Sequence, residues 1–237
     1  PAPGEADYVP DDYFGGDLNG IRQKLPYLQS LGVTCLYLNP VFEAASNHRY
    51  NTADYRAIDP LLGTEEEFAA LCAEARALGM RVMLDGVYNH ASWRHPFWPD
   101  VLKNGEKSAY FDWFCGVSME VLRGKTSKEL TADVMRGEKP FESFAFAADM
   151  PKWNTENPAV QDYLIGTAAE WTRKYGIDAW RLDVPDEVSF RFLEHFKKRI
   201  RETNPEAYII GEIWQKSTAW LRAGVFDGAM DYPLYFA

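Results

Sequence analysis

Hydrophobic residues in the first part of the chain change from helical spacing to a continuous run. From Asp17 to Leu31 apolar residues recur every three or four positions, which predicts an amphipathic helix that Gly32 ends. The next apolar run is VTCLYLNP, which has the continuous character of a buried strand and stops at Asn39-Pro40. The pattern therefore begins with one helix followed by one strand.

The same unit recurs along the rest of the chain. Thr64 and Glu67 have the spacing of a capping box, and they open the next predicted helix. The predicted helices cover about 64–78, 157–175, 186–201 and 217–222, and the strands that follow them are MRVMLDGVY, IDAWRLD, AYIIGEIW and VFDGAMDY.

Alternating helices and apolar strands predict an α/β fold with a parallel sheet, either doubly wound or a (β/α)8 TIM barrel. The stretch 91–150 breaks the alternation, because it is rich in Trp, Phe and Gly and lacks clean periodicity. It is too long for an ordinary strand–helix loop, so we expect a small inserted subdomain over the carboxyl ends of the strands. The expected domains are 1–90 and 151–237, both parts of the barrel, with 91–150 inserted between them.

Composition narrows the range of partners. Asp and Glu together number 35 against 25 Lys and Arg, and no Lys/Arg cluster stands out. Nucleic acid and anionic membrane are therefore not expected partners, and a neutral substrate fits better. No apolar run approaches the roughly 18 residues of a membrane span. The three cysteines are odd in number and widely spaced, which favours a reduced, cytoplasmic protein.

Acidic residues end three successive predicted strands. They are Asp85 in MLDGVYNH, Asp183 in WRLD and Glu212 in IIGEIW. The carboxyl ends of parallel strands meet at one edge, where α/β folds place their functional sites. A lone strand-end acid is more often a cap or turn residue, but three at equivalent positions favour a site. A ring of ion pairs closing a barrel end is the structural alternative. The polar residues that accompany these acids are Asn89, His90 and Arg181.

Two carboxyls and an arginine at one edge suit glycoside chemistry, in which one carboxylate attacks the anomeric carbon and one carboxylic acid protonates the departing oxygen. Arg181 and Asp183 are two residues apart and face the same side of a strand. Arg181 would therefore hold Asp183 ionised, while Ile213 and Trp214 would keep Glu212 protonated. The prediction is Asp183 as nucleophile and Glu212 as general acid/base.

These motifs resemble those of the α-amylase family of glycoside hydrolases, whose fold is a (β/α)8 barrel with a subdomain after the third strand. DGVYNH is similar to the family's first motif, WRLDVPDEV to the second and GEIW to the third; GVTCLYLNPVF and NHRYNTADY match further family segments. The resemblance covers essentially the whole chain. It implies Asp183 as nucleophile, Arg181 as its supporting arginine and Glu212 as acid/base.

The resemblance also implies substrate contacts, with Tyr50 stacking on the sugar whose bond is cleaved. For His90 the alternative is a core histidine, and for His48 it is a loop-stabilising role. Asn89 is the candidate calcium ligand, although the expectation is no metal and no cofactor. The implied substrate-binding residues are Tyr50, His90, Asp85, His48 and Trp214.

Within the family, MPKWN and GEIWQKSTAWLRAGVFDGAMDYP look most like the neopullulanase, cyclomaltodextrinase and maltogenic amylase group. That resemblance implies retaining hydrolysis or transglycosylation of α-1,4 or α-1,6 bonds in cyclodextrins, pullulan or maltooligosaccharides through a covalent glucosyl-enzyme. It also implies a cytoplasmic, homodimeric full-length protein. The fourth family motif is absent, so a fragment that is inactive alone is expected. The alternatives are a non-catalytic α-amylase-like binding protein and an α-glucoside isomerase.

Overall fold

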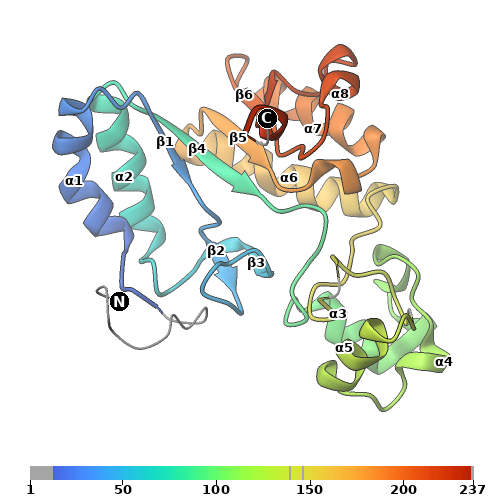
Figure 1. Ribbon diagram of the computed structural model, residues 1–237. Helices are drawn as coiled ribbons and strands as arrows, with labels where there is room; N and C mark the ends of the chain where they lie inside the picture. Colours follow the sequence, from blue (N-terminus) through green and yellow to red (C-terminus); the bar gives the residue numbers. More distant parts are fainter. Residues whose placement is uncertain (1–12, 139, 146, 236–237) are drawn as a thin grey trace.

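The computed structural model describes residues 13–138, 140–145 and 147–235. In this part of the chain five parallel strands form one sheet in the order β1-β4-β5-β6-β7 (Figure 1). The strands are β1 (Cys35–Leu38), β4 (Arg81–Gly86), β5 (Ala179–Leu182), β6 (Tyr208–Gly211) and β7 (Gly228–Ala229). The predicted parallel α/β architecture is confirmed.

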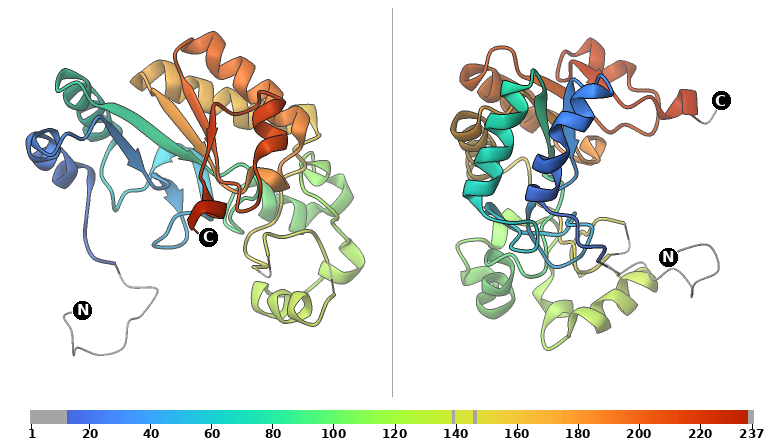
Figure 2. Two further views of the ribbon diagram at one scale, coloured as in Figure 1. Left: turned by 45° about the horizontal axis from the view of Figure 1, so that its top comes forward. Right: turned by 90° about the vertical axis from the view of Figure 1, so that its left-hand side faces the viewer.

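Four long helices cover one face of this sheet, as the two views of Figure 2 show. Each begins at a residue whose side chain accepts a hydrogen bond from the first turn: Asp17, Thr64, Asn157 and Ser189. Such caps satisfy backbone N–H groups that have no partner within the helix. The helices are α1 (Leu18–Ser30), α2 (Glu65–Ala77), α6 (Pro158–Tyr175) and α7 (Phe190–Thr203).

The two faces of the sheet differ because side chains alternate along each strand. Leu36, Val82 and Ile209 lie on the helix-covered face and are buried, whereas their neighbours Tyr37 and Tyr208 on the other face are exposed. Helices along one face and a curved parallel sheet are consistent with part of a TIM barrel, in which the second face lines the interior.

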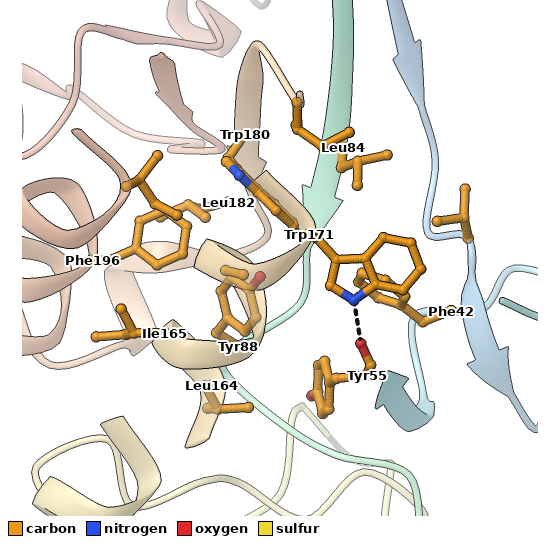
Figure 3. Close-up of a cluster of buried hydrophobic side chains, with 14 of the residues drawn as sticks. Phe42, Tyr55, Leu84, Tyr88, Leu164, Ile165, Trp171, Trp180, Leu182 and Phe196 are labelled. Carbon is orange, nitrogen blue, oxygen red and sulfur yellow. Dashed lines mark hydrogen bonds between the residues drawn. The ribbon is translucent and has the colours of Figure 1, made fainter. Parts of the chain in front are cut away.

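Aromatic side chains fill the space between the sheet and its helices (Figure 3). Trp180 is completely buried, and its Nε1 donates a hydrogen bond of 2.9 Å to Thr172 Oγ1 in α6. Trp171 Nε1 donates to the backbone oxygen of Tyr55 at 3.0 Å. Both indole groups therefore contribute apolar area without leaving a polar atom unsatisfied.

The connection between β4 and β5 holds three further helices, which gather away from the sheet in Figure 1. The stretch that holds these helices is closed at its base, because Ala91 N donates to Pro151 O at 2.9 Å and Trp153 N donates to Asn89 O at 3.0 Å. Lys152 continues the ties outward, accepting from Cys115 N at 3.0 Å. The three helices are α3 (Phe97–Asn104), α4 (Met119–Leu122) and α5 (Ser127–Met135).

The structure differs from the predicted elements in three places. An antiparallel pair, β2 (Phe42–Ala44) and β3 (Thr52–Ile58), was not expected. The helix predicted from about 186 begins at Phe190, because Pro185–Glu187 form a separate 3-10 turn and Ser189 caps the helix. Of VFDGAMDY only the two residues of β7 pair with the sheet. The remaining helices are α8 (Thr218–Arg222) and α9 (Tyr232–Tyr235). None of the helices in the described part of the chain has the length and apolarity needed to cross a membrane.

Candidate active site

Strand register brings the predicted site residues together. Asp85 on β4 lies directly opposite Arg181 on β5, and Arg181 lies opposite Ile210 on β6. Asp183 follows Arg181 by two residues and Glu212 follows Ile210 by two residues. Both side chains therefore emerge on the same face of the sheet as Arg181, just beyond the strand ends. The sheet therefore gathers the four polar side chains at one edge, as the sequence predicts.

Arg181 contacts all three carboxyl groups of this edge. Its Nη1 donates to Asp85 Oδ1 at 2.8 Å, to Asp85 Oδ2 at 2.9 Å and to Asp183 Oδ1 at 2.8 Å. Its Nη2 lies 2.5 Å from Glu212 Oε2. All four residues are buried. We call Asp85, Arg181, Asp183 and Glu212 the carboxylate cluster.

Asp85 is held from two further sides by tyrosines. Tyr37 donates its hydroxyl to Asp85 Oδ2 at 2.6 Å, and Tyr50 donates to the same oxygen at 3.0 Å. The Tyr50 ring also lies 5.8 Å from the Arg181 guanidinium carbon. Tyr37 was not among the predicted site residues. Tyr37 on β1 pairs with Met83 on β4, so it lies on the same face of the sheet as Asp85, two residues after Met83. Knowledge of this strand pairing would have identified Tyr37 as a neighbour of the site.

Glu212 also accepts hydrogen bonds from one backbone N–H and two aromatic side chains. Val184 N donates to Oε2 at 3.2 Å, while Trp214 Nε1 and Tyr232 Oη donate to Oε1 at 3.1 Å and 3.2 Å. The rings of Trp214 and Tyr232 stack with centroids 5.4 Å apart. Trp214 is nevertheless 60% exposed, so its ring combines a contact to Glu212 with a surface that is open to a ligand.

The ionisation of the cluster differs from the expectation. Burial raises the pKa of Asp183 to about 8; Arg181 opposes the rise, and the charges of Asp85 and Glu212 add to it. Burial also acts to raise the pKa of Glu212, but Arg181 and the hydrogen bonds from Trp214 and Val184 outweigh it and leave this pKa below its ordinary value. Both directions are opposite to those expected from the sequence, and burial of Asp183 is the largest cause. Arg181 compensates this burial only in part, because it also contacts Asp85 and Glu212.

The cluster opens into a cavity of about 360 Å³. Its walls come from the loop before β3, the loop after β4, the β4–β5 connection and the ends of β5 and β6. Seven predicted site residues line it, namely His48, Tyr50, His90, Arg181, Asp183, Glu212 and Trp214. Phe144, Met150 and Val184 also line it and were not predicted. Asp85 lies beneath the cavity wall and not on it. Asp85 is engaged by Arg181, Tyr37 and Tyr50 in this structure, and its role in substrate binding stays a prediction.

His90 is buried, and both of its ring nitrogens have partners. Nε2 lies 2.9 Å from Tyr50 O, and Nδ1 lies 3.1 Å from Asn89 Nδ2. Because a carbonyl only accepts and an amide nitrogen only donates, Nε2 carries the proton and the ring is neutral. Burial lowers the pKa of His90 to about 4, which agrees with this state. The ring stacks on Phe144 with centroids 4.9 Å apart.

Asn89, the candidate calcium ligand, is buried beside His90. Its Oδ1 has no hydrogen-bond partner in the described part of the chain. Among residues 13–138, 140–145 and 147–235, no group of three or more His, Cys, Asp or Glu side chains is arranged to hold a metal ion. His48 lies at the cavity mouth, where its Nδ1 accepts from Tyr50 N at 3.1 Å.

Comparisons with known proteins agree with this geometry. Residues 4–237 match the α-amylase catalytic domain. Intracellular maltogenic amylase of Bacillus subtilis is 45% identical over 230 residues, which are 97% of this chain and 37% of that protein. Neopullulanase 2 of Thermoactinomyces vulgaris is 43% identical over 223 residues, 94% of this chain and 36% of that protein. The chain spans a little over a third of the length of the curated relatives it matches.

Solved structures give the same result. A cyclomaltodextrinase superposes with a TM-score of 0.87 at 43% identity, covering 97% of this chain and 38% of that one. The cyclic α-maltosyl-(1→6)-maltose hydrolase of Arthrobacter globiformis in complex with maltose superposes with a TM-score of 0.86 at 37% identity, covering 98% of this chain and 50% of that one. The resemblance inferred from the sequence motifs is confirmed, and the chain belongs to the α-amylase catalytic-domain family.

Proposed function

We propose that this chain carries the catalytic centre of a retaining α-glucan hydrolase or transglycosylase. The observation that carries the proposal is the binding of Asp183 and Glu212 by one buried arginine at the floor of a cavity. In this proposal an Asp183 oxygen attacks the anomeric carbon while Glu212 gives its proton to the leaving oxygen. Water or a second sugar, deprotonated by Glu212, then releases the covalent glucosyl-enzyme.

The closeness of the two carboxyls supports retention. Asp183 and Glu212 contact the two terminal nitrogens of the same guanidinium, at 2.8 Å from Nη1 and 2.5 Å from Nη2, which supports the spacing of roughly 5 Å that retaining enzymes use. With one guanidinium among three carboxyls, the cluster keeps a proton near neutral pH. Catalysis requires that proton on Glu212, which contacts the same guanidinium as Asp183.

The aromatic residues of the cavity support a sugar substrate. The exposed ring of Trp214 and the ring of Tyr50 can pack against the C–H faces of glucose units on either side of the bond to be cleaved. His48 can donate or accept at the cavity mouth. We assign His90 a supporting role, in which its neutral ring orients Tyr50, since both ring nitrogens are already engaged.

The names of the relatives indicate the substrate class. Cyclomaltodextrinase, maltogenic amylase and neopullulanase point to cyclodextrins, maltooligosaccharides and pullulan, with α-1,4 and α-1,6 bonds as candidates. We further propose that the complete protein closes a (β/α)8 barrel, that 91–150 form its inserted subdomain between barrel parts 1–90 and 151–237, and that it acts as a cytoplasmic homodimer without metal or cofactor. The uncovered sheet face supports barrel closure, because parallel sheets bury both faces.

The test is product analysis from β-cyclodextrin, pullulan and soluble starch, using the full-length polypeptide that contains this chain. Glu212→Gln should abolish turnover, since it removes the proton donor and base. Glu206→Gln is the matched control, because Glu206 is exposed and precedes β6 at its opposite end. NMR of the first product should show the α-anomer.

Each contrary outcome identifies an alternative. Binding of these glucans without turnover would favour the non-catalytic relative. Isomerised disaccharides in place of free glucose units would favour an α-glucoside isomerase. A β-anomer as first product would overturn retention.

A further inference from the structure

Val184, which directly follows Asp183, has a backbone conformation that valine rarely adopts. Its φ of +33° and ψ of +53° lie in the left-handed region. The two γ-methyl groups on its Cβ make this region of φ and ψ costly for valine. The next residue is Pro185, which favours an extended conformation in the residue before it. Both local preferences therefore oppose the observed turn.

Neighbouring contacts hold Val184 in this conformation from both sides. Upstream, Asp183 N donates to Gly86 O at 3.1 Å, which fixes the end of β5 against β4. Downstream, Glu187 N donates to Val184 O at 3.1 Å, and Pro185 is buried. A strained residue that its surroundings over-determine in this way is typical of functional sites.

The strained turn aims a backbone group at the carboxylate cluster. Val184 N donates to Glu212 Oε2 at 3.2 Å, and Arg181 Nη2 contacts the same oxygen. The donating N–H belongs to the peptide bond that begins at Asp183. One rigid peptide unit thus links the residue proposed as nucleophile to the side chain proposed as acid/base.

The side chain of Val184 also restricts the movement of the peptide unit between Asp183 and Val184. Its side chain lines the cavity, and its branched Cβ confines the backbone to a far smaller range of φ and ψ than glycine would allow. Glycine would relieve the strain, so stability alone does not explain a valine at this position.

We propose that Val184 is a positioning residue, whose left-handed conformation fixes the peptide N–H between Asp183 and Glu212 and thereby sets the spacing of these two carboxyls. The inference rests on the proposed roles of Asp183 and Glu212. It differs from them in that Val184 acts through its backbone geometry and contributes no reacting group.

The experiment compares Val184→Gly with Val33→Gly in the full-length polypeptide. Val33 is a matched control, since it is also a half-buried loop valine next to a strand but does not have a positive φ. The melting temperature and the pH profile of kcat/KM on maltooligosaccharides are measured for both. For Val184→Gly we expect an unchanged or higher Tm, a kcat lowered about tenfold to a hundredfold, and a basic limb moved to higher pH. Val33→Gly should lower Tm and leave kcat and the pH profile unchanged.

The outcomes separate the inference from the function beneath it. A Val184→Gly enzyme with wild-type kcat and pH profile would overturn the positioning role alone. So would a Tm loss as large as that of Val33→Gly, because it would show that the valine is not strained. A wild-type protein without Glu212-dependent turnover would overturn the proposed function and the inference together.

Discussion

Arg181 is bound more fully by Asp85 than by either proposed catalytic carboxyl: its Nη1 lies 2.8 Å and 2.9 Å from the two oxygens of Asp85. These residues are register partners on β4 and β5. Asp85 in turn receives two tyrosine hydroxyls, so all its partners are fixed side chains. The guanidinium is thus anchored to the sheet from behind, and its free edge presents charge to Asp183 and Glu212.

Replacing Arg181 with lysine should damage both activity and stability. A lysine ammonium is a single point charge and cannot span the two sides of the cluster as the guanidinium does. We expect kcat to fall by at least about a hundredfold. Breaking a buried ion pair also typically costs about 3–5 kcal/mol of unfolding free energy, measurable by denaturant titration. The control is Arg199→Lys, at an exposed pair with Glu202, which should change stability by less than about 0.5 kcal/mol.

Asp183→Asn should stabilise the protein while abolishing turnover. Burial raises the pKa of Asp183 to about 8 from an ordinary 3.8, so the folded state keeps a proton that the unfolded state releases. The stability associated with this proton is present at low pH and is lost as pH rises from about 4 to 8. Asparagine removes that loss. The gain in Tm should therefore be larger at pH 8 than at pH 4, and an equal gain at both would contradict the raised pKa.

Tyr37→Phe should affect catalysis without removing any residue that touches substrate. The loss of its 2.6 Å hydrogen bond leaves Asp85 with fewer donors and a higher pKa. A protonated Asp85 releases Arg181, so we expect kcat to fall several-fold and the pH profile to shift while KM stays nearly constant. Tyr208→Phe is the control, because Tyr208 on β6 lies on the same face of the sheet as Tyr37 but donates its hydroxyl to Asp227 O. Equal effects of both variants would argue for a purely structural role of Tyr37.

Two buried histidines should make the fold sensitive to acid. Burial lowers the pKa of His95 to about 3 and that of His90 to about 4, from an ordinary 6.5. The unfolded chain takes up these protons below about pH 6.5 and the folded chain does not, so stability is lost as pH falls from 6.5 toward 4. His95→Gln keeps a partner for the Tyr163 hydroxyl and should flatten the fall in Tm between pH 7 and 4.5. An unchanged slope would exclude His95 as a cause.

The long periodic elements of this fold could be predicted from sequence because burial and capping agree there. The helix expected over 17–31 is α1, and its cap is Asp17. The pair β2 and β3 escaped prediction because β2 has only three residues and the pairing is irregular: Glu43 pairs with Asp54 across a register shift. Local patterns carry no information about such pairing.

The site shows the same division. Strand-end position was enough to bring Asp183 and Glu212 together, because strand register follows from the fold. The ionisation of these residues was not predictable, since it depends on how one arginine is divided among its partners. Neither Tyr37 nor the turn at Val184 follows from a motif. Tyr37 joins the site only through sheet pairing, and local preference at Val184 points to the wrong conformation.

The hydrogen bonds that tie Ala91 to Pro151 and Trp153 to Asn89 make a closed neck at the base of the β4–β5 connection. The residues between 92 and 149 therefore return to within a few residues of where they leave the barrel-like part of the chain. They are not independent of it, because Phe144 stacks on His90 and lines the cavity, and His95 packs against Trp153. A change in this stretch would therefore act on the shape of the cavity through Phe144 and on stability through His95.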